Sequence, residues 1–231
     1  MEKVNTPDEI LAQEFLSLTN ADAFTWLKEK SKPYIALMSY YRCAMMEIET
    51  KFKVLSEEHS LQHDRTPISA IKTRLKRLDS IHEKLGRQGF PKTLESMEEN
   101  LNDIAGVRVI CSFPADVYML EETFLRQDDI TLLRRKDYIA NPKANGYRSL
   151  HLIVSIPIYL ANGKREMKVE VQLRTIAMDM WASLEHELRY KSDRNFSDSD
   201  AARLRLCSEA IGEIDREMQR IYLGEKPEYE A

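Results

Sequence analysis

The chain lacks long apolar runs, an excess of positive charge and closely spaced cysteines, and each absence excludes a class of protein. No apolar run approaches the roughly 18 residues of a membrane-spanning helix. The N-terminal sequence MEKVNTPDEI lacks the apolar segment of a signal peptide. We therefore expect a cytoplasmic protein with no membrane partner.

The cysteines and histidines do not predict a metal site. Cys43, Cys111 and Cys207 are far apart in the sequence, and each lies within an apolar pattern, so we predict three reduced core residues. The segment His59 to Asp64 holds two histidines and an aspartate, but no further ligands lie at helical spacing nearby.

The charge balance limits the kind of partner. The formal net charge is −4, from 34 lysines and arginines against 38 aspartates and glutamates. Net repulsion of this sign opposes bulk binding of nucleic acid, so a site for an anion must be local. With 231 residues, 43% of them hydrophobic, the chain can bury one core that carries helical extensions.

Helices are predicted at both ends of the chain from capping signals and apolar periodicity. They are expected over residues 7–18, 22–30, 33–58, 176–191 and 200–222. The 33–58 helix carries an apolar stripe at alternating three- and four-residue spacing: Met38, Tyr41, Met45, Ile48, Phe52 and Leu55. The 200–222 helix carries a matching stripe: Leu204, Cys207, Ile211, Ile214, Met218 and Ile221. Both stripes need a partner surface, and self-association is the simplest one.

The middle of the chain predicts a sheet. Alternating apolar residues indicate strands over residues 68–75, 107–113, 130–139, 150–158 and 166–175, with helices after the first two. We predict an α+β fold with a nucleotidyltransferase-like mixed sheet of about five strands, flanked by helices. The expected parts are N-terminal helices (1–60), a central domain built on the sheet (61–192) and a C-terminal helical extension (193–231).

A basic strand and helix form the first candidate anion site. Alternation places Lys72, Arg74 and Lys76 on one side of the strand, and Ser80 and Lys84 lie four residues apart on one helix face. A triphosphate fits along that line, with the helix N-terminus near residue 77 adding its dipole. The alternative is a solvated basic face.

The loop from Lys136 to His151, KDYIANPKANGYRSLH, is the second candidate site. Its Asn-Gly turn presents Tyr147 at a fixed place just before an apolar strand, with Lys143 and Arg148 nearby. An aromatic platform surrounded by cations suits a nucleotide. The alternative is a basic surface hairpin with a half-buried tyrosine.

Two carboxylates lie at strand positions close to these basic groups. Asp103 precedes the second strand, and Glu170 shares the polar face of the last strand with Gln172. Carboxylates for Mg²⁺ and a cationic cradle are the parts that phosphoryl transfer requires. A solvent-facing polar row would show the same pattern.

Five segments together resemble the synthetase domain of the RelA/SpoT family, above all its single-domain small alarmone synthetases of the YwaC/RelP type. These segments are RLKRLDSIHEKL, DIAGVRVIC, KDYIANPKANGYRSLH, VEVQLRT and AMDMWASLEHELRYK. The resemblance covers about residues 47–191. It implies transfer of pyrophosphate from ATP to the ribose 3′-hydroxyl of GDP or GTP, which gives ppGpp or pppGpp and AMP. The family's hydrolase domain does not fit in this length.

The resemblance also assigns roles to residues. It implies that Arg74 and Arg108 sandwich adenine, and that the ATP phosphates contact Lys76, Ser80 and Lys84. Mg²⁺ would be held by Asp103 and Glu170, with Glu170 also activating the acceptor hydroxyl beside Gln172. Guanine would stack on Tyr147, and the acceptor side would be lined by Lys136, Lys143, Asn145 and His151. Enzymes of this size in the family are homotetramers, so the same is expected here. Ala70 and Lys72 depart from the pattern with which another branch binds a pppGpp effector.

Two other functions are open at this stage. A pyrophosphokinase of the same fold could use another acceptor, such as an adenine nucleotide or a tRNA 3′ end. A regulator that binds single-stranded RNA would use the basic helix and Tyr147. Two carboxylates beside the anion site favour the enzyme.

Overall fold

The protein is built around one five-stranded mixed sheet with the strand order β1-β2-β5-β4-β3. The structure, a computed structural model, describes residues 20–190 and 196–225. The strands are β1 (Ile68–Leu75), β2 (Ala105–Cys111), β3 (Thr131–Asp137), β4 (Leu150–Leu160) and β5 (Gly163–Thr175). The predicted α+β class and the predicted five strands are confirmed.

The strand pairing brings distant segments together in the middle of the sheet. Strands β2 and β5 are parallel, and all the other pairs are antiparallel. The register places Arg108 opposite Gln172 and Gly106 opposite Glu170, while His151 on β4 faces Gln172 from the other side. The polar faces of β2, β4 and β5 therefore form one continuous surface.

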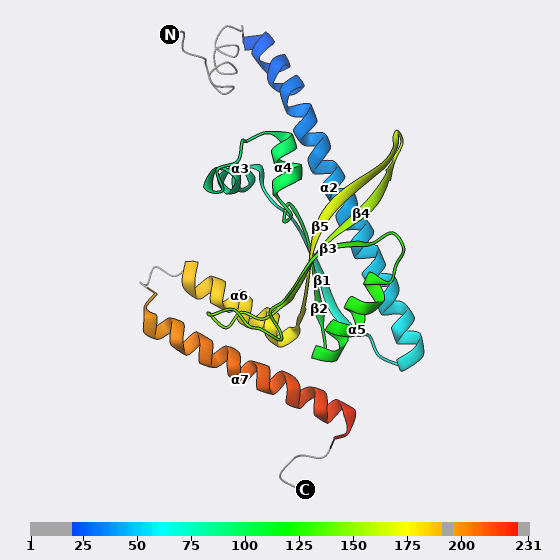
Figure 1. Cartoon of the computed structure of the whole chain (residues 1–231), viewed down its shortest axis with the longest axis vertical. Coiled ribbons are helices and arrows are strands. Elements are labelled where there is room, and N and C mark those ends of the chain that lie inside the picture. Colours follow the sequence, from blue (N-terminus) through cyan, green and yellow to red (C-terminus); the bar gives the residue numbers. More distant parts are fainter. Residues whose placement is uncertain (1–19, 191–195, 226–231) are drawn as a thin grey trace.

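Helices lie on both sides of this sheet. Figure 1 shows α2 (Asn20–His63) and α5 (Pro114–Leu125) along one face, with α3 (Leu78–Arg87), α4 (Leu94–Asn100) and α6 (Ile176–Tyr190) on the other side. Helix α7 (Asp198–Leu223) packs against α6. None of the described helices is long and apolar enough to cross a membrane.

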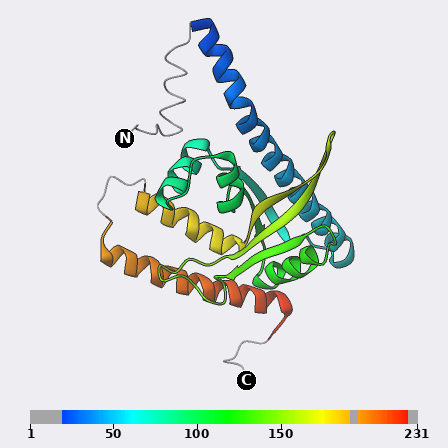
Figure 2. The same ribbon diagram turned by 45° about the horizontal axis from the view of Figure 1, so that its top comes forward.

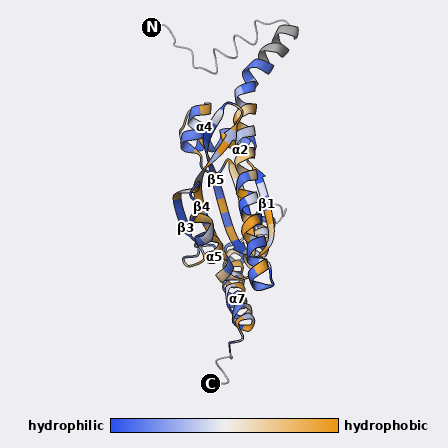
Figure 3. Cartoon of the chain, turned by 90° about the vertical axis from the view of Figure 1, so that its right-hand side faces the viewer, coloured by the Kyte–Doolittle hydropathy of each residue, from blue (hydrophilic) through white to orange (hydrophobic). Residues whose placement is uncertain are grey.

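The core lies between α2, α5 and the apolar face of the sheet. Tyr41, Ile48 and Phe52 of α2 are buried there, and the Phe52 ring stacks on Phe124 of α5 with centroids 4.6 Å apart. Hydrophobic and hydrophilic residues alternate along the strands, as Figure 3 shows. The apolar face therefore packs on helices, and the polar face is free to build a site.

Several predictions about helices were wrong. The helices expected at 22–30 and 33–58 are one helix, α2, which continues through Pro33. Proline removes one backbone hydrogen bond, which costs stability but does not prevent the helix from continuing. Helix α4 was not predicted, although Thr93 caps it by accepting a hydrogen bond from the backbone N–H of Ser96. The helix expected at 7–18 lies outside the described residues.

The α2 stripe is buried in the core of its own chain, so it cannot form the predicted interface between copies. Apolar residues at helical spacing on α6 are also not buried, since Ile176, Met180, Leu184 and Leu188 are 49–53% exposed. The inward face of α6 carries Met178, Asp179 and Trp181. Helix α6 starts directly after β5, so the last residue of β5 fixes which side of the helix faces inward.

Helix α7 also turns its stripe outward. Ile214, Met218 and Ile221 are exposed, and Cys207 is exposed rather than a core residue. The buried positions of α7 are Ser208, Gly212 and Asp215. The small residues Ser208 and Gly212 lie inward, and the backbone of the loop before β4 approaches the helix closely at Ser208.

Candidate active site

Two cavities lie side by side on the polar face of the sheet, and each is large enough for a nucleotide-sized ligand. The β1-side cavity, of about 400 Å³, is lined by Lys72, Thr73, Arg74, Lys76, Asp103, Gly106, Val107, Arg108, Glu170 and Gln172. The β3-side cavity, of about 410 Å³, is lined by Lys84, Gln88, Asn100, Asn102, Asp103, Arg134, Lys136, Tyr138, Lys143, His151, Ile153 and Glu170. Asp103 and Glu170 line both cavities and form the wall between them.

Asp103 is held by two lysines from the β1–α3 segment. Its Oδ2 atom accepts hydrogen bonds from Lys76 Nζ at 2.6 Å and pairs with Lys84 Nζ at 2.7 Å. Burial by itself would raise the pKa of Asp103, but the two ammonium groups outweigh it and lower that pKa below its usual value. Its Oδ1 atom is buried and has no partner among the described residues. Asp103 is thus ionised and has one oxygen free for a ligand.

Glu170 is the second carboxylate of the shared wall. Burial raises its pKa, and hydrogen bonds from His151 and Gln172 lower it, with a net lowering. Oε2 accepts a hydrogen bond from Gln172 Nε2 at 2.9 Å, and Oε1 lies 3.3 Å from His151 Nδ1. The charge of Asp103 opposes the lowering. Two neighbouring carboxylates that are both kept ionised by cations and donors are suited to a divalent cation.

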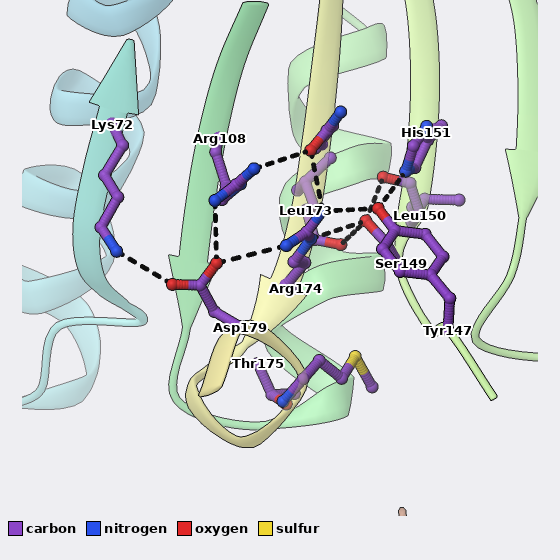
Figure 4. Close-up of polar contacts among 12 residues, drawn as sticks. Lys72, Arg108, Tyr147, Ser149, Leu150, His151, Leu173, Arg174, Thr175 and Asp179 are labelled. Carbon is purple, nitrogen blue, oxygen red and sulfur yellow. Dashed lines mark hydrogen bonds and ion pairs between the residues drawn. The ribbon is translucent and has the colours of Figure 1, made fainter. Parts of the chain in front are cut away.

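Asp179 of α6 gathers three cations that line or border the β1-side cavity (Figure 4). Its carboxylate is contacted by Lys72 Nζ at 2.9 Å, Arg108 Nη1 at 3.2 Å and Arg174 Nη1 at 3.3 Å. Asp179 was not predicted from the sequence. The contact fixes the Arg108 side chain along the polar face of the sheet, where Arg108 Nη2 also approaches Gln172 Oε1 at 3.5 Å.

A closed ring of hydrogen bonds links the two cavities, and Figure 4 shows the part of it around Arg174, Tyr147 and His151. Arg174 donates to the hydroxyl of Tyr147 and to Gln172 Oε1. The Tyr147 hydroxyl lies 2.7 Å from His151 Nε2, and the ring closes through His151, Glu170 and Gln172. Because Arg174 donates to Tyr147, the phenol hydrogen is available to His151 Nε2, and Nδ1 then carries the hydrogen that faces Glu170.

Arg174 is buried, with 4% of its surface exposed, and sequence reasoning missed its role. Alternation along β5 puts Arg174 on the same face as Glu170 and Gln172. A strand pattern does not reveal that the end of that face is covered by α6 and the loop before β4.

An ammonium group lies between two aromatic rings at the rim of the β3-side cavity. Lys143 Nζ is 4.7 Å from the ring centroid of Tyr138 and 4.8 Å from that of Tyr147. The Tyr138 ring meets the His151 ring edge-on, with centroids 5.3 Å apart. Tyr138 lines the cavity and was not predicted as a site residue. The sequence did offer a signal for Tyr138, because the KDY segment places this aromatic residue close to the cation Lys136.

The predicted residues lie in different parts of the site. Arg74, Lys76 and Arg108 line the β1-side cavity, whereas Lys84, Lys136, Lys143 and His151 line the β3-side cavity. Tyr147 borders the site through its hydroxyl. Asn145 builds the loop, since its Oδ1 atom accepts a hydrogen bond from the Tyr147 backbone N–H at 3.1 Å. Ser80 lies in the first turn of α3, where its backbone N–H donates to Asp79.

Comparison with known proteins identifies the family. The profile of a region found in RelA/SpoT proteins matches residues 73–195. The chain is 40% identical over 203 residues to the GTP pyrophosphokinase YwaC of Bacillus subtilis, covering 88% of this chain and 95% of that protein. The chain belongs to the RelA/SpoT family. The resemblance found in the sequence is confirmed.

Solved structures of relatives have the same fold as this RelA/SpoT protein. The small alarmone synthetase 1 of B. subtilis bound to its product pppGpp matches with a TM-score of 0.76 and 35% identity, over 85% of this chain and all of that one. The same synthetase bound to AMPCPP matches with a TM-score of 0.69 and 34% identity, over 83% and 96% of the two chains.

Proposed function

We propose that this RelA/SpoT protein is a GTP pyrophosphokinase, which transfers pyrophosphate from ATP to the 3′-hydroxyl of GDP or GTP and releases AMP. The observation that carries the proposal is the pair of nucleotide-sized cavities separated by Asp103 and Glu170. ATP would occupy the β1-side cavity and the acceptor the β3-side cavity. The relatives named as pyrophosphokinases and alarmone synthetases support the same reaction.

The β1-side cavity fits a purine base between two arginines. Arg74 lies opposite Gly106 in the β1–β2 register, and Arg108 follows two residues later on the same face of β2. Gly106 has no side chain, which leaves space for a flat ring between the two guanidinium groups. Arginine stacks on an aromatic plane in a way that lysine does not reproduce. Lys76 lies next to this space and would contact the phosphates.

Asp103 and Glu170 fit a Mg²⁺ ion as its protein ligands. The unpartnered, buried Oδ1 of Asp103 is the observation that tests the fit. Among the described residues there is no cluster of three or more metal-ligating side chains. Two carboxylates suffice, because Mg²⁺ in such sites completes its shell with substrate phosphates and water. When bound, the ion would neutralise charge on the transferring phosphoryl group.

The chain's own residues account for the rest of the reaction. In the proposed step the acceptor 3′-oxygen bonds to the β-phosphorus of ATP, the bond from that phosphorus to the bridging oxygen of AMP breaks, and the hydroxyl proton passes to Glu170. The lowered pKa of Glu170 keeps it ionised before transfer. Lys76 and Lys84 supply positive charge beside the reacting phosphates.

Product analysis tests the function. The purified protein is incubated with Mg²⁺, ATP and one acceptor at a time, and nucleotides are separated by thin-layer chromatography or mass spectrometry. We expect ppGpp from GDP, pppGpp from GTP, and AMP in equal amount. Pyrophosphorylated adenine nucleotide or tRNA instead would establish the alternative acceptor. Absence of any transferred product, together with tight binding of single-stranded RNA, would overturn the enzymatic proposal.

We further propose that the protein acts in the cytoplasm as a homo-oligomer, with a tetramer as the expected form. The exposed apolar residues of α6 and α7, rather than the buried α2 stripe, offer the surface for association. Light scattering at micromolar concentration tests the assembly. A monomeric mass would contradict it.

A further inference from the structure

We propose that α7 positions the acceptor loop, residues 138–149 between β3 and β4, and that Ser208 and Gly212 are its positioning residues. The proposal rests on the proposed function, because it concerns how well the β3-side cavity receives its nucleotide. Helix α7 begins at Asp198, beyond the 73–195 region that matches the family.

Ser208 holds the backbone of the loop immediately before Tyr147. Its side chain is 2% exposed, and its hydroxyl donates a hydrogen bond to the carbonyl oxygen of Gly146. Gly146 has φ +95°, and a Cβ at this position would lie 2.8 Å from Ser208 Cβ and 3.4 Å from Arg205 Cα. The loop backbone thus rests directly on the helix, and only glycine fits there.

Gly212 supports the residue immediately after Tyr147. A Cβ at Gly212 would lie 3.3 Å from both Cζ and Nε of Arg148, so the guanidinium group lies over the bare helix backbone. Arg148 Nη1 also donates to the carbonyl oxygen of Ile139 at 3.2 Å. Arg148 therefore connects α7 to the start of the acceptor loop.

Tyr147 lies between these two contacts, and α7 also contacts Thr175, the neighbour of the arginine that donates to the Tyr147 hydroxyl. Asp215 of α7 accepts a hydrogen bond from the Thr175 hydroxyl, next to Arg174, which donates to Tyr147. Trp181 of α6 donates its indole N–H to the carbonyl oxygen of Leu204 at 2.9 Å. In both Figure 1 and Figure 2, α7 runs alongside the loop that precedes β4. The helix thus supports Tyr147 from both backbone sides and, through Thr175, near its hydroxyl.

The test uses Ser208→Ala in the full-length chain, with Ser199→Ala as the matched control because Ser199 lies exposed on the same helix. Steady-state kinetics vary each substrate at saturation of the other. We expect the KM for GDP to rise about three- to tenfold and the KM for ATP to change by less than about twofold. Amide hydrogen exchange at Gly146 and Tyr147 should become faster. The control should match wild type in all three measurements.

Gly212→Ala provides a second, independent variant. Alanine favours the helix, so any loss of loop order comes from crowding of Arg148 and not from loss of helix. It should raise the KM for GDP in the same selective way. Equal changes in both KM values, faster exchange with an unchanged KM for GDP, or unchanged exchange would each overturn the positioning role.

The two proposals fail in distinguishable ways. A wild-type chain that transfers pyrophosphate to no acceptor would refute the proposed function. The hydrogen-exchange comparison between Ser208→Ala and Ser199→Ala does not depend on turnover, so it still decides whether α7 holds the loop.

Discussion

The two cavities share a wall but are built from different kinds of structure. The β1-side cavity is lined mainly by residues of three paired strands, whose spacing is fixed by the ladder of backbone hydrogen bonds. The β3-side cavity combines residues from α3, α4 and the α4–β2 connection with residues from three strands and a loop. A strand position is set by its own sheet, whereas the loop depends on contacts from α6 and α7. The β3 side should therefore respond more strongly to distant substitutions.

The largest effect is expected from substitution of the two carboxylates, Asp103 and Glu170, that both cavities share. Asp103→Asn and Glu170→Gln each keep side-chain volume and remove a charge, so both should abolish transfer. The loss should be about 3 kcal/mol or more in activation free energy, over about 100-fold in kcat. Activity is measured as product formation. Circular dichroism is the separate control that the variants fold. Near-normal turnover in either variant would remove these carboxylates from the mechanism.

The next largest effect should be confined to the β3 side. Tyr147→Ala removes the proposed guanine platform, and loss of one base stack predicts a ten- to hundredfold fall, roughly, in kcat/KM for the acceptor. Tyr147→Phe keeps the ring but breaks the hydrogen bonds to Arg174 and His151. It should therefore cost about three- to tenfold rather than nothing. An equal loss for ATP and acceptor would contradict the assignment of this loop.

Arg74→Ala should show the opposite asymmetry. Removal of one stacked guanidinium group should raise the KM for ATP about five- to thirtyfold and leave the KM for the acceptor nearly unchanged. Lys53→Ala, an exposed position on α2, is a suitable control. A selective rise in the acceptor KM would place ATP in the other cavity.

The smallest effect concerns acid stability on the β1 side. Burial raises the pKa of Asp179, but Lys72, Arg108 and Arg174 outweigh it, so the folded-state pKa lies below the unfolded value of about 3.9. The unfolded chain then binds more protons between these two pKa values. Stabilisation by Asp179 is fully present above about pH 4 and is lost as the pH falls through the folded-state pKa.

Asp179→Asn should accordingly lower the melting temperature at neutral pH, and its difference from wild type should shrink as the pH falls below about 4. Thermal unfolding followed by circular dichroism at several pH values measures both. Because Asp103 and Glu170 also have lowered pKa values, the variant keeps part of the acid sensitivity. A pH-independent difference would show that the ion pairs contribute nothing.

Helices α2 and α7 show why sequence periodicity predicts some features and not others. Both carry apolar side chains at the same spacing, yet the α2 stripe is buried against the sheet and the α7 stripe is exposed. Periodicity reveals that a helix has an apolar face. It does not reveal which surface that face meets, because the partner lies elsewhere in the sequence.

By itself the sequence determined the strands, most of the helices and the alternation that places Arg108, Glu170 and Gln172 on one polar face. These features follow from local spacing of side chains along a helix or strand. Only the tertiary structure decided that Asp179 and Arg174 hold that face together, that Asp103 and Glu170 separate two cavities, and that Ser208 supports the loop of Tyr147. Those contacts join residues that are distant in sequence, and their geometry depends on how the sheet, α6 and α7 pack.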